Sequence, residues 1–235
     1  LGTDRMIPLI FKMSLPAVAA QLVNLLYNIV DRIYIGHIPG IGTDALAGIG
    51  VTSAVIVLIS SFSAIVGAGG SPLAAIALGR GNRERAGQIL GNGFILLLIF
   101  TILTSATTYL FMEPILLFTG ASENTIGYAT DYLSIYLLGT LFVELSVGLN
   151  TFINTQGRPT IAMYSVLIGA ILNIGLDPLF IFTFGMGVKG AALATILSQA
   201  CSAIWVISFL TSKKASLRLE YRYMKLHKGI ILSIL

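Results

Sequence analysis

Residues 53–60 read SAVIVLIS and residues 94–100 read FILLLIF, and these two unbroken apolar runs decide the fold. A strand of a membrane β-barrel would alternate polar with apolar residues, which neither run does. Each run belongs to a longer apolar stretch of the length, about 20 residues, that a helix needs to cross a bilayer. The two runs therefore predict an all-α protein whose helices span a membrane.

The composition of the whole chain supports this fold class. Hydrophobic residues make up 56% of the 235 residues, charged residues only 10%, and the mean hydropathy is +0.91. A soluble domain is about one quarter charged and cannot hide this much apolar surface from water. The lipid bilayer is therefore the expected partner of most of the surface.

Six apolar stretches, separated by short polar or Gly- and Pro-containing breaks, predict a polytopic six-transmembrane-helix bundle. Residues 1–212 would form this one lobe, which leaves no soluble domain to carry an activity. Residues 213–228 are basic and predict a cytoplasmic connector, and residues 229–235 predict the start of a seventh, truncated helix. The predicted spans are residues 13–37, 50–78, 88–112, 126–155, 160–183 and 188–211.

The net charge of +4 is distributed by membrane side and does not indicate nucleic-acid binding. Arg and Lys precede the first span and fill the connections at residues 80–85 and 213–228, whereas the opposite connections contain Lys189 beside Glu113 and Glu123. Positively charged loops stay in the cytoplasm, so both termini are expected there.

The first span carries a stripe of polar residues at spacings of three, four and three, which place them on one helical face. Amides in membranes commonly form interhelical hydrogen bonds, but an aspartate in the same stripe favours an aqueous cavity or an ion site. Tyr27 either stacks on an aromatic substrate or packs against neighbours. Arg32 points about 100° away from Asp31, where it snorkels to the interface or pairs elsewhere. The stripe consists of Gln21, Asn24, Asn28 and Asp31.

The fifth span ends in NIGLDPLFIF, residues 173–182, with Asn173 and Asp177 on one face directly before Pro178. The proline removes a backbone donor and disturbs that helical turn. Freed carbonyl oxygen beside a carboxylate suits a cation or a proton relay, and a kink capped by the aspartate is the structural alternative. The sixth span carries polar side chains at helical spacing, namely Thr195, Ser198, Gln199 and Ser202.

Counting residues from the predicted turns places Asp31, Asp177 and Thr195 at a similar depth, in the outer half of the membrane. They can meet, together with Asn173, if the first, fifth and sixth spans are neighbours. Two carboxylates in a site of low dielectric repel each other, so a proton or a shared Na⁺ ion is expected to neutralise them.

No Ser/His/Asp set, metal-ligand cluster or phosphate-binding loop occurs in the sequence, so neither an enzyme nor a cofactor is expected. Glu144, in the fourth span, lies off the stripe formed by Ser146, Asn150 and Asn154. It either lines a cavity or pairs with a neighbour.

A family resemblance rests on five stretches spread over nearly the whole chain. They are SLPAVAAQLVNLLYNIVDRIYIGH (14–37), ALGRGNRERAG (77–87), LNTFINTQGRPTIAM (149–163), NIGLDPLFIF (173–182) and GVKGAALATILSQ (187–199). In this order they resemble the N-terminal six-helix lobe of a prokaryotic multidrug and toxic compound extrusion (MATE) transporter. Such a transporter has twelve helices in two lobes and exports organic cations in exchange for H⁺ or Na⁺.

The resemblance implies roles for particular residues. Asp31 matches the first-helix acidic position, and Pro16 matches the proline at which that helix bends. Asn150 resembles the fourth-helix asparagine, although its depth lies nearer the cytoplasm. The implied ion-coupling set, which would bind H⁺ or Na⁺, consists of Asp31, Asn173, Asp177 and Thr195.

The expected function is thus cation-coupled export of amphipathic, cationic drugs across a prokaryotic inner membrane, with a second six-helix lobe as the missing partner. A related flippase for lipid-linked oligosaccharides is the alternative, although its cavity would need several basic residues. A structural or channel-like subunit is a third reading. The sequence leaves open whether H⁺ or Na⁺ is the coupling ion.

Overall fold

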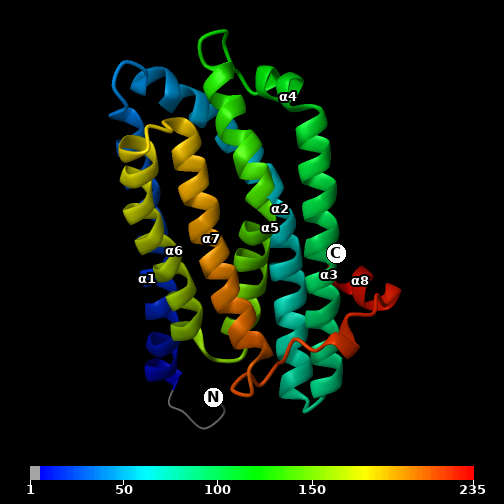
Figure 1. Cartoon of the computed structure of the whole chain (residues 1–235). Coiled ribbons are helices and arrows are strands. Elements are labelled where there is room, and N and C mark those ends of the chain that lie inside the picture. The colour runs from blue at the N-terminus through cyan, green and yellow to red at the C-terminus, as the bar shows by residue number, and fades with distance from the viewer. Residues whose placement is uncertain (1–5) are drawn as a thin grey trace.

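The computed structural model describes the backbone of residues 6–235, and the side chains of all of these except residues 6–10, 12 and 13. Arg5, part of the predicted charge pattern, lies outside the described residues. All the regular elements in the described part are helices, as predicted (Figure 1). Its elements are α1 (Met6–Gly36), α2 (Gly42–Gly79), α3 (Arg83–Leu110), α4 (Met112–Phe118), α5 (Ile126–Thr155), α6 (Pro159–Pro178), η1 (Leu179–Thr183), α7 (Val188–Thr211), η2 (Tyr221–Tyr223) and α8 (Lys228–Ile234).

Five helices within residues 6–235 are long and apolar enough to cross a membrane, namely α2, α3, α5, α6 with η1, and α7. The predicted spans 126–155 and 188–211 coincide with α5 and α7. The first predicted span, residues 13–37, falls on α1, which ends at Gly36, is 31 residues long and packs along α6 but is not among the five. Its crossing of the membrane stays a prediction.

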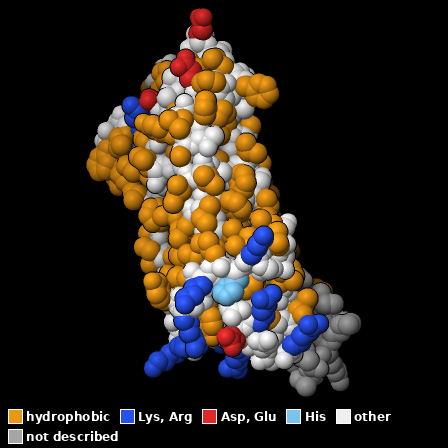
Figure 2. Space-filling view, turned by 90° about the vertical axis from the view of Figure 1, so that its right-hand side faces the viewer, with side chains coloured by type: hydrophobic (Ala, Val, Ile, Leu, Met, Phe, Trp, Pro, Cys, Tyr) orange, Lys and Arg blue, Asp and Glu red, His pale blue; other side chains and the backbone are white. Residues whose placement is uncertain are grey.

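The long helices run up and down side by side, and α5 lies at the centre, packed against α2 and α7 (Figure 1). The connections at residues 80–82, 156–158 and 212–227 lie at one end of the bundle, and those at 37–41, 111–125 and 184–187 at the other. Figure 2 shows Lys and Arg side chains gathered at one end, with an apolar band above them. This is the charge separation that the sequence predicts.

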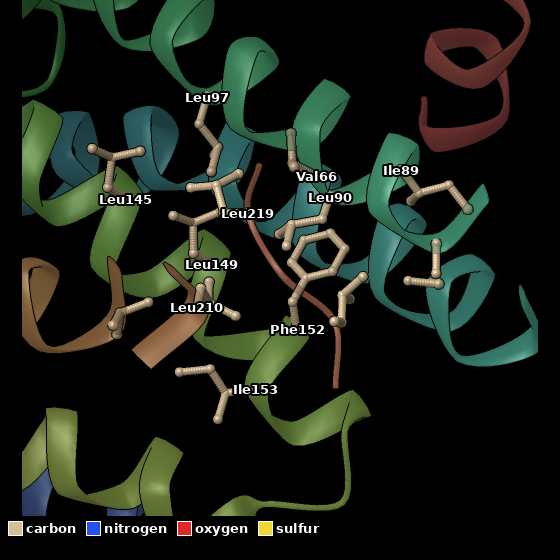
Figure 3. Close-up of a cluster of buried hydrophobic side chains, with 14 of the residues drawn as sticks. Val66, Ile89, Leu90, Leu97, Leu145, Leu149, Phe152, Ile153, Leu210 and Leu219 are labelled. Carbon is tan, nitrogen blue, oxygen red and sulfur yellow. The ribbon is translucent and has the colours of Figure 1, made fainter. Parts of the chain in front are cut away.

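The main apolar core lies where α2, α3 and α5 meet, and Phe152 fills its centre with no solvent exposure. Figure 3 shows Val66, Leu97 and Leu149 converging there, with Leu219 contributed by the segment after α7. Leu217 and Leu219 are both almost fully buried. The predicted connector is therefore part of the core.

Two side chains hold the backbone of this connector. Asn92, fully buried in α3, donates from Nδ2 to the Lys225 carbonyl (3.1 Å) and accepts from the His227 amide at Oδ1 (2.8 Å). Gln156 Oε1 accepts a bond from the Leu217 amide at 3.0 Å. A glycine at position 91 allows the Tyr223 backbone to approach α3 where a Cβ would collide with it.

Candidate functional site

The predicted residues of the fifth and sixth spans meet in the structure, because α6 packs between α1 and α7. Asn173 Nδ2 donates to Asp177 Oδ1 at 3.1 Å and lies 3.5 Å from Thr195 Oγ1. The Thr195 hydroxyl itself donates to the Ala191 carbonyl at 3.0 Å. Asp177 is fully buried and Asn173 is 2% exposed, so water reaches neither side chain from the surface.

Asp31 joins this group from α1. Its side chain is half-buried and interacts with the Asp177 carboxyl group. The structure thus brings together two carboxyl groups, an amide and a hydroxyl that the sequence placed at one depth. We call Asp31, Asn173, Asp177 and Thr195 the carboxylate cluster.

Three buried oxygen atoms of the carboxylate cluster have no hydrogen-bond partner among the described residues: Asp31 Oδ1, Asn173 Oδ1 and Asp177 Oδ2. Buried polar atoms without a partner are rare, since each forfeits the free energy of its hydration. A proton or a small cation that prefers oxygen ligands would satisfy them. The described residues contain no group of three or more His, Cys, Asp or Glu that could hold a metal ion.

A cavity of about 540 Å³ opens beside the carboxylate cluster, between α1, α2, α5, α6 and α7. Asp31 and Thr195 line it, whereas Asn173 and Asp177 lie behind its wall. Ser198, predicted as a cavity or network residue, is also buried behind the wall, and its hydroxyl has no partner among the described residues. The other predicted residues that line the cavity are Pro16, Gln21, Asn24, Tyr27, Asn28, Asn150 and Gln199.

The amides on the cavity wall form hydrogen bonds of two kinds. Asn28 Nδ2 donates to the Asn24 carbonyl of its own helix at 2.7 Å. Asn150 Nδ2 donates to the Ala162 carbonyl (3.2 Å), and Gln199 Oε1 accepts from the Ser146 hydroxyl (2.7 Å). The last two bonds join α5 to α6 and to α7, so these amides both fix the wall and face the cavity.

The cavity also contains residues that the sequence reasoning missed or placed elsewhere. Tyr132 and Tyr136 line it with their rings stacked, at a centroid distance of 6.1 Å. Their spacing of four residues in the fourth span was the signal that could have found them. Arg32 lines the cavity as well, and its Nη2 donates to Ser53 Oγ on α2 at 3.4 Å. Of the two expectations for Arg32, pairing elsewhere is the one observed.

Pro178 changes the helix directly after Asp177, as its missing backbone donor predicts. Regular α-helix ends at Pro178, and residues 179–183 continue as a π-helix whose bonds include Phe184 N to the Leu179 carbonyl at 2.9 Å. One-turn π segments inside helices often occur at functional sites. The wider turn begins two residues after the buried Asp177, towards the outer side in the predicted orientation.

Comparison with known proteins shows the family of the chain. A family model described as MatE matches residues 16–179, which include the polar stripe of α1 and the pair of carboxylates. The chain belongs to the MatE family. This is a family of transporters and not of enzymes.

The MatE relatives include proteins with two kinds of named activity. Multidrug export protein MepA of Staphylococcus haemolyticus is 28% identical over 221 residues, which cover 94% of this chain and 48% of the relative. The FAD transporter of Shewanella oneidensis is 34% identical over 194 residues, which cover 80% of this chain and 42% of the relative. The chain spans about half the length of the curated relatives it matches.

Solved MatE structures resemble this chain over the same half. The crystal structure of MATE in the bent conformation is 28% identical to this chain with a TM-score of 0.87. The match covers 96% of this chain and 50% of the chain in that structure. The straight conformation has the same TM-score and coverage, with 27% identity. The chain is therefore one lobe of a multi-pass membrane transporter of this family.

Proposed function

We propose that this chain is the N-terminal lobe of an antiporter that exports amphipathic, cationic drugs in exchange for H⁺ or Na⁺. The carboxylate cluster is the observation that carries the proposal, because Asp31 and Asp177 are close together and three of the cluster's oxygens have no partner among the described residues. Relatives named as multidrug export proteins support the drug as the other ligand.

In this proposal the coupling ion neutralises the cluster and the drug occupies the cavity beside it. Two carboxylates held together in a site of low dielectric repel each other, and binding of H⁺ or Na⁺ removes that repulsion. Loading the ion therefore favours the conformation in which α1 and α6 approach most closely. Asp31 belongs to both the cluster and the cavity wall, so a change in α1 alters the shape of the drug site.

Pro16 is the proposed point at which α1 changes shape. It lies inside the continuous helix and lines the cavity. A proline in a helix interior removes one backbone bond, which makes that turn easier to bend. Ion binding at Asp31 and bending at Pro16 would then act on the same cavity from two points of one helix.

The charge pattern indicates how the proposed antiporter is oriented in its membrane. We place the chain in the inner membrane of a prokaryotic cell, with both termini and the basic connector in the cytoplasm. The partner that completes the drug cavity is a second six-helix lobe, which lets one bundle move against the other.

The test is ethidium efflux by the full-length transporter carrying Asp177→Asn, with the proton or sodium gradient intact or collapsed. The amide keeps the shape of the side chain and loses the charge, so we expect gradient-driven efflux to disappear while membrane insertion is unchanged. Asp31→Asn should have the same effect, and the double variant should be little worse than either, as for residues that act as one unit. Asp44→Asn, an exposed aspartate near the start of α2, is the matched control.

Normal ion-coupled efflux by Asp177→Asn would show that this aspartate is structural and that the coupling site lies elsewhere.

A second candidate, export of a dinucleotide such as FAD, is favoured by one observation. Arg32 lines the cavity, and the FAD transporter of Shewanella oneidensis is 34% identical to this chain. A guanidinium group is suited to phosphate because its planar donors match phosphate oxygens. Arg32 is also the one basic side chain among the described residues that line the cavity, which does not favour the flippase alternative.

Arg32→Gln separates the two candidates. If a dinucleotide is the substrate, the variant should lose flavin transport into vesicles by about ten- to a hundredfold, since hydrogen bonds to charged groups contribute about 1.5–3 kcal/mol. If organic cations are the substrates, ethidium efflux should be unchanged or higher. Flavin transport that survives the substitution would exclude Arg32 as a phosphate-binding residue.

A further inference from the structure

A second buried carboxyl group lies away from the carboxylate cluster, between α2 and α5. Glu144 is 1% exposed, and its Oε2 accepts a hydrogen bond from the Ser63 hydroxyl at 2.6 Å. Its Oε1 has no hydrogen-bond partner among the described residues. Neither Glu144 nor Ser63 lines the cavity, so the proposed mechanism does not use them.

No basic side chain within the described part of the chain forms an ion pair with Glu144. The elements packed against α5, the helix of Glu144, carry their charges near their ends: Asp44 in α2, Arg83, Glu84 and Arg85 in α3, Glu113 in α4, Asp177 in α6 and Lys189 in α7. The ionisable group that interacts with Glu144 is Tyr136 of its own helix. A carboxylate without a cationic partner is unfavourable at this depth in a membrane, whereas a protonated carboxyl group is tolerated.

Ser63 can satisfy Glu144 in both protonation states. When the carboxyl group is ionised, the Ser63 hydroxyl donates to Oε2, as observed. When Oε2 carries a proton, it can donate to Ser63 Oγ, which then turns its own O–H to the Ser60 carbonyl at 3.3 Å. One proton is gained or lost between the two states, and in both of them a hydrogen bond joins Ser63 to the carboxyl group.

Residues near this pair on both helices line the cavity, among them Val143, which directly precedes Glu144. Ser60, three residues before Ser63 on α2, lines the cavity, and so does Tyr136 on α5. Ser60 and Tyr136 therefore belong to the part of the cavity wall that is formed by the two helices carrying Ser63 and Glu144. A small separation of α2 from α5 at this wall would let cavity water reach the carboxyl group.

We propose that Glu144 and Ser63 form a second proton-binding site, separate from the carboxylate cluster, which exchanges a proton with cavity water during transport. The proton goes to or comes from water, and no other group is consumed. This inference rests on the proposed antiport, and it adds a second ionisable group whose proton is released when a cationic substrate binds.

Calorimetry of ethidium binding to the full-length transporter, in two buffers of different ionisation enthalpy, measures the protons released per ethidium bound. Glu144→Gln keeps the size of the side chain and can still accept from Ser63, but it cannot carry a proton. We expect the proton count to fall by about one in Glu144→Gln, because linkage requires the proton and the cation to oppose each other's binding. Glu113→Gln, an exposed glutamate in α4, should leave the count unchanged.

An unchanged proton count in Glu144→Gln, with ethidium still bound, would overturn the proposal and leave Glu144 as a packing residue. Asp177→Asn tests the proposed function separately: no effect of Asp177→Asn together with a lower count in Glu144→Gln would refute the carboxylate cluster and keep the second site. If Glu144→Gln does not accumulate in membranes, infrared spectra of the Ser63→Ala variant test the proposal instead. In Ser63→Ala, the carboxyl stretching band that responds to ethidium should lie at a different frequency from that of wild type. An identical band in the two proteins would overturn the proposal.

Discussion

Asp177 is fully buried, and the one hydrogen bond that it accepts from a described side chain comes from Asn173. Its second oxygen and the free oxygens of Asp31 and Asn173 have no partner among the described residues. Thr195, like Asp31, connects this group to the cavity, because its half-buried side chain lies on the cavity wall and its hydroxyl is 3.5 Å from Asn173. At the scale of single residues, the cluster is a group of buried oxygens, which a proton or a cation would neutralise in the proposed function.

Thr195→Val should weaken ion coupling without abolishing it. Valine has the shape of threonine but removes one oxygen from the cluster, and one hydrogen bond contributes about 0.5–1.5 kcal/mol. We expect the cation concentration at half-maximal ethidium efflux to rise by about two- to tenfold. The control is Thr140→Val in α5, a buried threonine whose hydroxyl donates to Tyr136 of its own helix. Equal effects of both substitutions would mean that Thr195 contributes only to packing.

At the scale of the elements, close helix packing holds the cluster and the cavity in place. α5 packs against both α2 and α7 over much of its length, and glycines lie where the helices approach each other most closely. At Gly139, a Cβ would collide with the side chain of Ile196 on α7. Small residues at helix interfaces in membranes allow this approach, and van der Waals contact then stabilises the pair.

Gly139→Ala should lower stability, whereas Gly127→Ala should not. The added methyl group at position 139 forces α7 away from α5, and overpacking of this kind typically costs about 1–3 kcal/mol. Gly127 lies in the same helix with open space around its Cα, so alanine there should be neutral or stabilising by up to about 1 kcal/mol. Thermal unfolding of the two purified variants in detergent measures the difference. A Gly139→Ala protein as stable as wild type would show that α7 moves aside without loss.

At the scale of the whole molecule, charge is separated along the bundle. Basic side chains gather at the end that contains the start of α1 and the connector, and the apolar band lies between this end and the other (Figures 1 and 2). The connector is held to this end by Asn92 and Gln156, so it belongs to the body of the lobe. The cavity is bordered by five helices of a chain that spans half the length of its relatives.

Cysteine labelling in intact cells should distinguish the two ends. In a background with Cys201→Ser, which removes the one cysteine of this sequence, a membrane-impermeant maleimide should label Ser122→Cys and miss Ser216→Cys. Both serines are exposed, and they lie in connections at opposite ends of the bundle. The reason is that the basic end is retained in the cytoplasm. Labelling of Ser216→Cys from outside, in cells whose membranes are intact, would reverse the proposed orientation.

The sequence by itself determined the membrane class, five of the long helices and the common depth of the polar residues. Residues 126–155 and 188–211 became α5 and α7 without a shift at either end. The physical reason is that these features are local: hydrophobic length, turn residues and helical spacing act within one segment. The break in regular α-helix at Pro178 was local in the same way, since it follows from one missing backbone donor.

Only the tertiary structure decided which polar groups face each other and which face the cavity. It placed Asp177 behind the cavity wall and Asp31 on it, put Arg32 beside Ser53, and joined Ser63 to Glu144 across 81 residues. These outcomes depend on how each helix is rotated about its axis and on which helix lies beside it. Those quantities are set by packing between side chains far apart in the chain, which the spacing within one segment does not contain.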